Sequence, residues 1–334
     1  MSLTDILIPD WIKQGLRRAV QDHKLPHAYL FVGPAGVGKR TTAIALAKAI
    51  NCSTQSGEAC DRCAVCRRID RGVYPDVHWL EPQGQTLKID QIRQLQELLM
   101  LQAYEGRMKV AVLDDVEKLT IEAANSLLKI LEEPPQGTLF ILLCQNLGGL
   151  PATVTSRAQV LRFGLVPRDR LVTLLQRHQR RPADAERAAA LSGGRPGHAL
   201  GLELPKALEL RAEALHLLMQ AHKGDPAAIL GSAEQWAKRK NDHSSLFEML
   251  LSLSRDLAIA QAGGGEGALM HGDLQATLAP LAGSAAPATW WQVFDIIHTT
   301  QQAIIHNANP QLALEVMLLR IGDAYERPRQ RDRG

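Results

Sequence analysis

Four of the five cysteines lie close enough in the sequence to share one metal ion. Cys52, Cys60, Cys63 and Cys66 follow the spacing C-x7-C-x2-C-x2-C. Zn²⁺ takes four thiolates in a tetrahedral shell, and each C-x2-C pair lets a tight turn present two sulfurs to one ion. A shell closed by four protein ligands leaves no position for a reacting water, so we predict a structural zinc site. The alternative is a group of unligated buried cysteines, but the surrounding Gly, Asp and Arg residues favour the metal.

A glycine-rich loop followed by a lysine is the second chemical feature. The sequence GPAGVGKRT at 33–41 follows an apolar run and opens a helical pattern, which is the context of a phosphate-binding loop. Backbone N–H groups at the helix start would cradle phosphates, and Lys39 would add positive charge. The next residue normally holds Mg²⁺ through a hydroxyl group, but here it is Arg40, and Thr41 lies about 100° further round the helix. The sequence therefore predicts a phosphate cradle without its metal ligand, formed by Gly33, Gly36, Gly38, Lys39, Arg40 and Thr41.

Two acidic residues follow the apolar run at 110–113. An acid at the end of such a strand helps to hold Mg²⁺ beside a phosphate loop, and Asp114 has this position. A glutamate normally follows it in active ATPases and positions the attacking water, whereas this chain has Asp115, which is one methylene shorter. A misplacement of about 1 Å can reduce a rate ~10²-fold. We therefore do not expect ATP hydrolysis, and the residues leave open whether nucleotide is bound at all.

The first half of the chain alternates between strand and helix patterns. Short apolar runs predict strands, and segments with helical spacing predict the helices between them. This alternation is typical of a parallel sheet with helices on both faces. The predicted strands are 28–32, 76–80, 110–113 and 139–143, and the predicted helices are 41–50, 89–101 and 121–132. Cys144 follows the last of these strands and is expected to belong to the core.

The pattern becomes entirely helical after Phe163. Proline residues interrupt a small helical segment, and helical patterns at 207–220, 245–261 and 290–306 follow it, with a flexible break at 263–267. We predict an α/β domain at 1–165, a small helical lid at 166–204 and an all-helical domain at 205–334.

The amino-acid composition is that of a globular protein. The chain has 334 residues, 46% of them hydrophobic and 22% charged, as is usual for a globular protein. The N-terminus shows no secretory signal and no stretch approaches the ~18 apolar residues of a membrane span, so a cytoplasmic location is expected. The net charge of +3 is weaker than that of most dedicated nucleic-acid binders.

The motifs taken together resemble the AAA+ subunits of the bacterial DNA polymerase III clamp loader. The similarity rests on LPHAYLFVGPAGVGK, the cysteine spacing, YPDVHWLEP, LDDVEKLTIEAANSLLKILEEPP and TSRA, and is strongest between His27 and Arg157. It implies an AAA+ P-loop NTPase fold with a zinc-module insertion, a small helical lid and an all-α collar domain for oligomerisation. It also implies that Arg157 is an arginine finger for a neighbouring subunit and that Gln145 is the sensor beside the nucleotide. Ala158 replaces the family cysteine, and Gly197 stands where the family has a second sensor arginine, with Arg195 two residues earlier.

The departures from the family pattern favour a stator over a motor subunit. Arg40, Asp115 and Gly197 each replace a part that an ATPase needs, whereas Arg157 is kept. The resemblance then implies a hetero-pentamer with tau/gamma and delta subunits, which loads a sliding clamp onto primed DNA. The chain also lacks the long extra domains of tau. Two alternatives remain open, namely an active tau/gamma-like ATPase, which ATP turnover by the isolated chain would favour, and a zinc-dependent DNA-binding module, which salt-sensitive DNA binding would favour.

Overall fold

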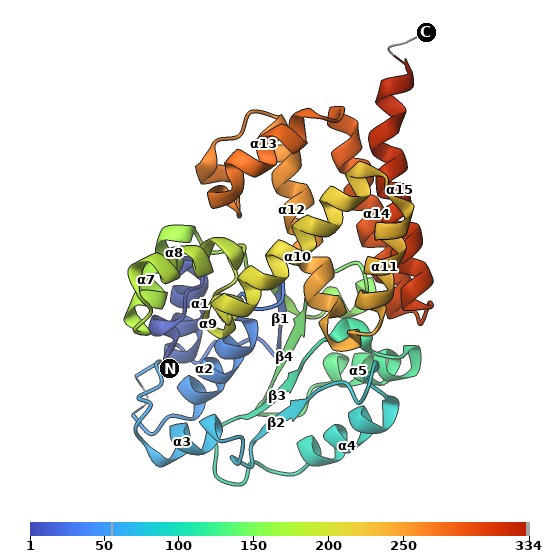
Figure 1. The fold of residues 1–334 in the computed structure, drawn as a ribbon. Helices are drawn as coiled ribbons and strands as arrows, with labels where there is room; N and C mark the ends of the chain where they lie inside the picture. The colour runs from blue at the N-terminus through green and yellow to red at the C-terminus, as the bar shows by residue number, and fades with distance from the viewer. Residues whose placement is uncertain (55, 332–334) are drawn as a thin grey trace. The chain divides into compact units, whose positions relative to one another are not determined.

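The computed structural model describes residues 1–54 and 56–331, which fall into two structural units (Figure 1). One unit contains residues 1–179 together with 194–201. The other contains residues 180–193 and the chain from 202 onward. None of the helices in the described part of the chain combines the length and the apolar character needed to cross a membrane.

A parallel sheet organises the first unit. Among the described residues it has five strands in the order β2-β3-β4-β1-β5, and each adjacent pair is parallel. Leu30 of β1 pairs with Leu142 of β4 on one side and with Val160 of β5 on the other. In this order β4 lies on one side of β1 and β5 on the other, so the strand order reverses at β1. Open α/β sheets bind ligands just beyond the carboxyl end of a strand at such a reversal, and the loop after β1 has this position. The strands are β1 (Ala28–Val32), β2 (Val77–Leu80), β3 (Lys109–Leu113), β4 (Thr138–Cys144) and β5 (Gln159–Arg162).

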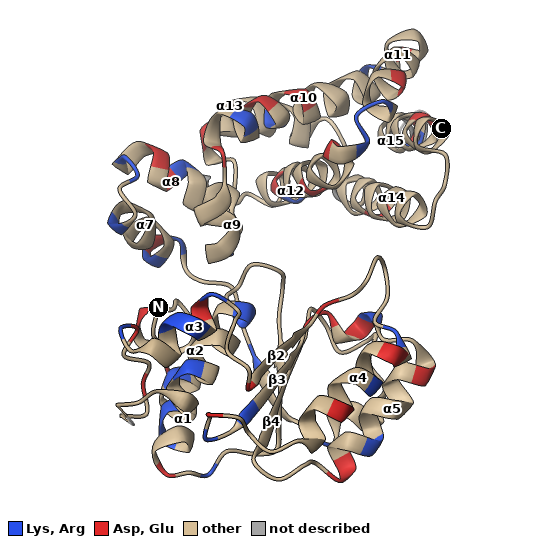
Figure 2. Ribbon diagram, turned by 90° about the horizontal axis from the view of Figure 1, so that it is seen from below, with Lys and Arg blue, Asp and Glu red and all other residues tan. Residues whose placement is uncertain are grey.

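Helices cover both faces of this sheet (Figure 2). Strand side chains point alternately to opposite faces, so Tyr29 and Phe31 pack with α1, α2 and α3, whereas Leu30 and Val32 pack with α4 and α5. Burial on both faces explains why β1, β3 and β4 read as continuous apolar runs. The helices of this unit are α1 (Asp10–Gln21), α2 (Lys39–Asn51), α3 (Ala64–Asp70), α4 (Ile89–Met100), α5 (Ile121–Glu132), α6 (Ala152–Thr155), α7 (Arg168–Arg177) and α9 (Pro196–Gly201).

The expected alternation of strands and helices is confirmed. The strand at 28–32 and the helix at 121–132 have the predicted bounds, and the other predicted elements of the first unit shift by one or two residues at their ends. Sequence patterns missed β5, α1 and α3. β5 is a four-residue edge strand in which only Leu161 is buried, so it carries almost no hydrophobic signal.

The second unit is helical. Its core contains Trp290, whose side chain is fully buried and whose Nε1–H donates to the Ala282 carbonyl at 3.3 Å. The neighbouring Trp291 is 69% exposed, so the two tryptophans have different environments. The expected break at 263–267 separates α12 from α13, and the three-domain division with a lid at 166–204 stays a prediction. The helices are α8 (Pro182–Leu191), α10 (Leu204–Lys223), α11 (Pro226–Ala237), α12 (His243–Gln261), α13 (Gln275–Gly283), α14 (Pro287–Ile305) and α15 (Pro310–Arg331).

Candidate functional site

The glycine-rich loop joins β1 to α2 and encloses its own lysine. Gly36 and Gly38 have φ angles of 79° and 103°, in a region that side chains disfavour, and Gly38 caps the start of α2. Lys39 is buried, and its Nζ donates to the carbonyl oxygens of Gly33 at 2.5 Å and Pro34 at 3.0 Å. Burial lowers the pKa of Lys39, although the nearby Asp114 carboxylate opposes this effect. The loop therefore has the shape of a phosphate cradle, and Lys39 donates its hydrogen bonds to carbonyl groups of the loop itself.

Arg40 extends from the first turn of α2 toward the ends of β2 and β3. Its guanidinium forms an ion pair with Glu81 and lies 3.5 Å from Asp114 Oδ2. It also stacks over the Trp79 ring at 4.4 Å from the ring centroid. Trp79 Nε1–H in turn donates to Glu81 at 2.8 Å. Arg40 is thus bound by three side chains at the position where a hydroxyl group would contact Mg²⁺.

The two acids after β3 have different roles in the structure. Burial raises the pKa of Asp114, the nearby Asp115 raises it further, and Arg40 opposes both effects. Asp115 has a φ of 50°, and its carboxylate forms an ion pair with Lys118 at 2.7 Å. A carboxylate held by a lysine on its own turn is a poor base for activating water.

A further acid, Glu117, was not predicted from the sequence. Its Oε1 accepts from the backbone N–H of Gln145 at 3.0 Å, so it holds the residue that follows β4. Its Oε2 is buried and has no hydrogen-bond partner among the described residues. The only signal in the sequence was its position three residues after Asp114, which is not diagnostic by itself.

The phosphate loop, Arg40 and the two acids after β3 line one cleft of about 390 Å³ in the first unit. The backbone N–H of Gly197 donates to the Gly36 carbonyl at 2.8 Å, and a Cβ at Gly197 would lie 3.1 Å from that oxygen. Arg195 contacts His198 Nδ1 at 3.1 Å. Of the predicted nucleotide-site residues, the lining includes Gly36, Gly38, Lys39, Arg40, Thr41, Asp114, Asp115 and Gln145. Gly33 contributes the carbonyl that binds Lys39.

Arg157 is not among the lining residues of this cleft. It follows α6 and forms an ion pair with Glu132, at the end of α5, with an Nη2–Oε1 distance of 2.6 Å. Its Nη1 donates to the Thr153 carbonyl at 3.0 Å. The guanidinium is therefore fixed on the surface of this chain, away from the chain's own phosphate loop.

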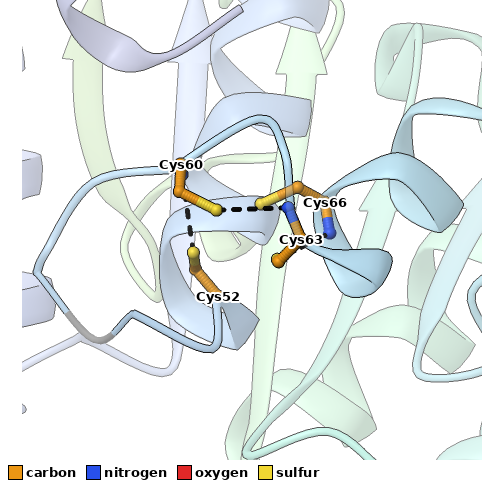
Figure 3. Close-up of side chains that lie close together, drawn as sticks. All are labelled: Cys52, Cys60, Cys63 and Cys66. Atoms are coloured by element: carbon orange, nitrogen blue, oxygen red, sulfur yellow. Dashed lines mark hydrogen bonds between the residues drawn. The ribbon is translucent and has the colours of Figure 1, made fainter.

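The four clustered cysteines converge on one point (Figure 3). Their Sγ atoms all lie within 4.8 Å of one another, so they can hold a metal ion. The backbone N–H of Cys63 donates to Cys60 Sγ, and that of Cys66 donates to Cys63 Sγ, each at 3.4 Å. Burial raises the pKa of Cys63, but the Cys66 N–H and hydrogen bonds from Ser53 stabilise its thiolate and bring the pKa to about 5. The arrangement suits a soft divalent cation, because sulfur ligands in the thiolate form are what such ions bind.

A buried lysine anchors the cysteine loop to α2. Lys48 is 1% exposed, and its Nζ contacts Asp61 at 2.5 Å and Asp70 at 2.8 Å. Burial alone would lower its pKa, but the hydrogen bonds to Asp61 and Asp70 raise it. The N-terminal amine of Met1 also contacts Asp61, at 2.9 Å. Sequence reasoning missed this anchor, because a lysine within an apolar helix gives no indication of its partners.

Comparisons with known proteins agree over both units. The family described as "DNA polymerase III, delta subunit" matches residues 9–166, and "DNA polymerase III, delta subunit, C terminal" matches residues 205–323. The DNA polymerase III subunit delta' of Bacillus subtilis (strain 168) is 33% identical over 269 residues, which cover 78% of this chain and 79% of that protein. The subunit delta' of Escherichia coli (strain K12) is 29% identical and covers 93% of this chain and 94% of its own length. The subunit tau of B. subtilis is 26% identical over 95% of this chain but only 61% of its own length.

Proposed function

The chain belongs to the DNA polymerase III delta' family of clamp-loader subunits, and we propose that within the clamp loader it is a stator that supplies Arg157 to the ATP site of a neighbouring subunit. Its partners in this role are tau/gamma and delta subunits in a hetero-pentamer, and the complex acts on a sliding clamp and primed DNA. In this role the chain has an AAA+ domain at 1–165, a small helical lid at 166–204 and a collar at 205–334.

The contrast between Arg40 and Arg157 supports this role most strongly. Within the cleft, Arg40 replaces the metal-binding hydroxyl and pairs with Asp114, while Asp115 pairs with Lys118. Outside the cleft, Arg157 is held in place by Glu132 and the Thr153 carbonyl. A chain whose own site is altered in this way has no use for a preoriented arginine of its own, whereas a neighbouring ATPase site does.

Zinc is proposed as the metal of the cysteine cluster. The donor set consists of four sulfurs, which is typical of structural Zn²⁺ sites, and the N–H donors around Cys63 favour the thiolate form that zinc requires. No position is left for a substrate. The metal would fix the loop between α2 and α3 and take no part in a reaction.

The decisive experiment is Arg157→Ala in a reconstituted clamp loader. We expect assembly to be unchanged and DNA- and clamp-stimulated ATP hydrolysis to fall, with clamp loading reduced in parallel. An arginine finger is worth ~10³–10⁵ in rate at its own site, and the complex as a whole loses less because other sites keep theirs. Arg93→Ala is the matched control, since Arg93 is an exposed arginine on α4 whose partner Asp90 is 4.0 Å away.

Wild-type rates of loading and ATP consumption in the Arg157→Ala complex would show that Arg157 is only a surface residue. The isolated chain also separates the alternatives. Turnover at the rate of a working motor would favour a tau/gamma-like ATPase. Salt-sensitive DNA binding by the isolated chain would favour a DNA-binding module, although Figure 2 shows positions of Lys and Arg interspersed with positions of Asp and Glu along the helices.

A further inference from the structure

The cleft contains a fixed positive group at the place of a metal ion. In phosphate-binding loops, Mg²⁺ is held by the hydroxyl after the lysine and by the acid that ends the neighbouring strand. Here the hydroxyl is absent, and the acid, Asp114, lies 3.5 Å from an Arg40 nitrogen. Mg²⁺ prefers six oxygen ligands. Here the carboxylates of Asp114 and Glu81 already pair with the Arg40 guanidinium, which would repel the ion, so the residues present do not fit Mg²⁺.

Three side chains hold the Arg40 guanidinium, although the Arg40 side chain is 56% exposed. It pairs with Glu81 as well as Asp114, and its guanidinium stacks on the Trp79 ring. Glu81 is itself fixed by the Trp79 Nε1–H donor. Guanidinium groups stay charged at all physiological pH values and combine stacking with planar hydrogen bonding. These contacts keep a permanent positive charge beside the phosphate loop.

The remainder of the cleft suits a nucleotide. Gly36, Gly38 and Lys39 form a loop at the start of α2, where backbone N–H groups and the helix dipole favour phosphate. Ile6, Leu7, Leu174 and Leu200 also line the cleft, which offers an apolar surface for a base. The volume of about 390 Å³ lies in the range of small-molecule sites.

We infer that the Arg40 guanidinium takes the place of the divalent cation, so that this cleft binds a nucleoside di- or triphosphate without Mg²⁺. On binding, Lys39 would exchange its carbonyl partners for phosphate oxygens, and Arg40 would offer its remaining N–H donors to the same group. The bound nucleotide would not be hydrolysed, since no metal-held phosphate or free catalytic carboxylate is provided. This inference is independent of the role of Arg157, so its failure would leave the stator proposal in place.

The test measures the affinity of the purified full-length chain for ATP and ADP by calorimetry, once with excess Mg²⁺ and once with excess EDTA. We expect wild-type binding to be no tighter with Mg²⁺ than with EDTA, because Mg²⁺ in solution complexes the phosphate groups that Arg40 would contact. Arg40→Thr supplies the missing hydroxyl, removes the competing charge and should bind at least tenfold more tightly with Mg²⁺ than with EDTA, a difference of ~1.4 kcal/mol. Arg40→Met removes the charge without adding a ligand and should weaken binding in both buffers.

Arg93→Thr is the control, because it makes the same type of change on α4, outside the residues that line the cleft. It should bind nucleotide like the wild type. Wild-type binding that strengthens tenfold on addition of Mg²⁺ would overturn the inference, and so would the absence of saturable binding in both buffers. Wild-type affinity in Arg40→Met would also overturn it. The wild-type measurement alone decides the question if a variant does not fold.

Discussion

Replacing Cys63 with Ser should release the metal and unfold the cysteine loop while the sheet stays folded. Cys52, Ala59 and Cys66 form a small buried cluster that is separate from the two cores of the sheet. Such a cluster is too small to fold the loop without a metal, whose binding contributes roughly 10 kcal/mol or more in small zinc domains. The cysteine loop should therefore lose its folded structure completely, whereas the rest of the first unit should be destabilised only slightly.

The packing of α3 against the sheet determines how much the loss of the metal destabilises the first unit. Ile69 of α3 is 5% exposed and belongs to the core that covers one face of the sheet. Exposing one such side chain costs about 1.5–3 kcal/mol. Each kcal/mol lowers the melting temperature of a domain of this size by about 2–4 °C. We therefore expect the melting temperature of the first unit to fall by roughly 3–12 °C.

Metal content by mass spectrometry, limited proteolysis and thermal unfolding by circular dichroism would measure these effects. The wild type should contain about one Zn²⁺ per chain. Cys144→Ser is the control for metal content, because Cys144 lies in β4, where burial raises its pKa to about 12. Stoichiometric zinc in Cys63→Ser would refute the ligand assignment. An unchanged cleavage pattern in a zinc-free variant would refute the structural role of the metal.

Three further predictions follow from the site and the cores. The isolated chain should release phosphate from ATP at the background rate in a steady-state assay, and a motor-like rate that Lys39→Ala abolishes would contradict this. Burial would raise the pKa of Asp76, but three backbone N–H donors at 104–106 lower it below 3.8. Asp76→Asn should therefore cost about 1.5–3 kcal/mol of unfolding free energy near neutral pH. The wild type should lose stability as pH falls from 3.8 through the folded pKa of Asp76, which urea titrations at several pH values would detect. Trp290→Ala should destabilise the helical unit by about 3–5 kcal/mol, whereas the exposed Trp291→Ala should change stability by less than ~0.5 kcal/mol in the same urea experiment.

The sheet was predictable because its signal is local. Each buried strand is a short apolar run between turn residues, and the glycine-rich loop marks where the first strand meets a helix. β5 lacks such a run, and α3 is too short to show a period clearly. Whether these two segments form a strand or a helix depends on the elements that pack against them in the fold.

The partners of the site residues were not predictable from the sequence. The replacement at Arg40 was visible, but its contacts with Trp79 and Glu81 come from a strand about forty residues away. The sequence places Lys48 in an apolar helix, and only the fold shows that its Nζ contacts both Asp61 and Asp70. Spacing along a chain reveals residues of one motif, whereas ion pairs between motifs depend on the sheet register and helix packing.

The central position of β4 has a consequence for how the protein is made. All seven residues of β4 are buried, and its partner β1 lies more than a hundred residues earlier in the chain. During synthesis β1 therefore leaves the ribosome before β4 and β5, which are its two neighbours in the sheet, and stays unpaired until both have been made. Unpaired apolar strands are the segments that aggregate in such intermediates. Expression of this chain should consequently depend more on translation rate and chaperones than its folded surface suggests, and fragments that end before residue 144 should be insoluble.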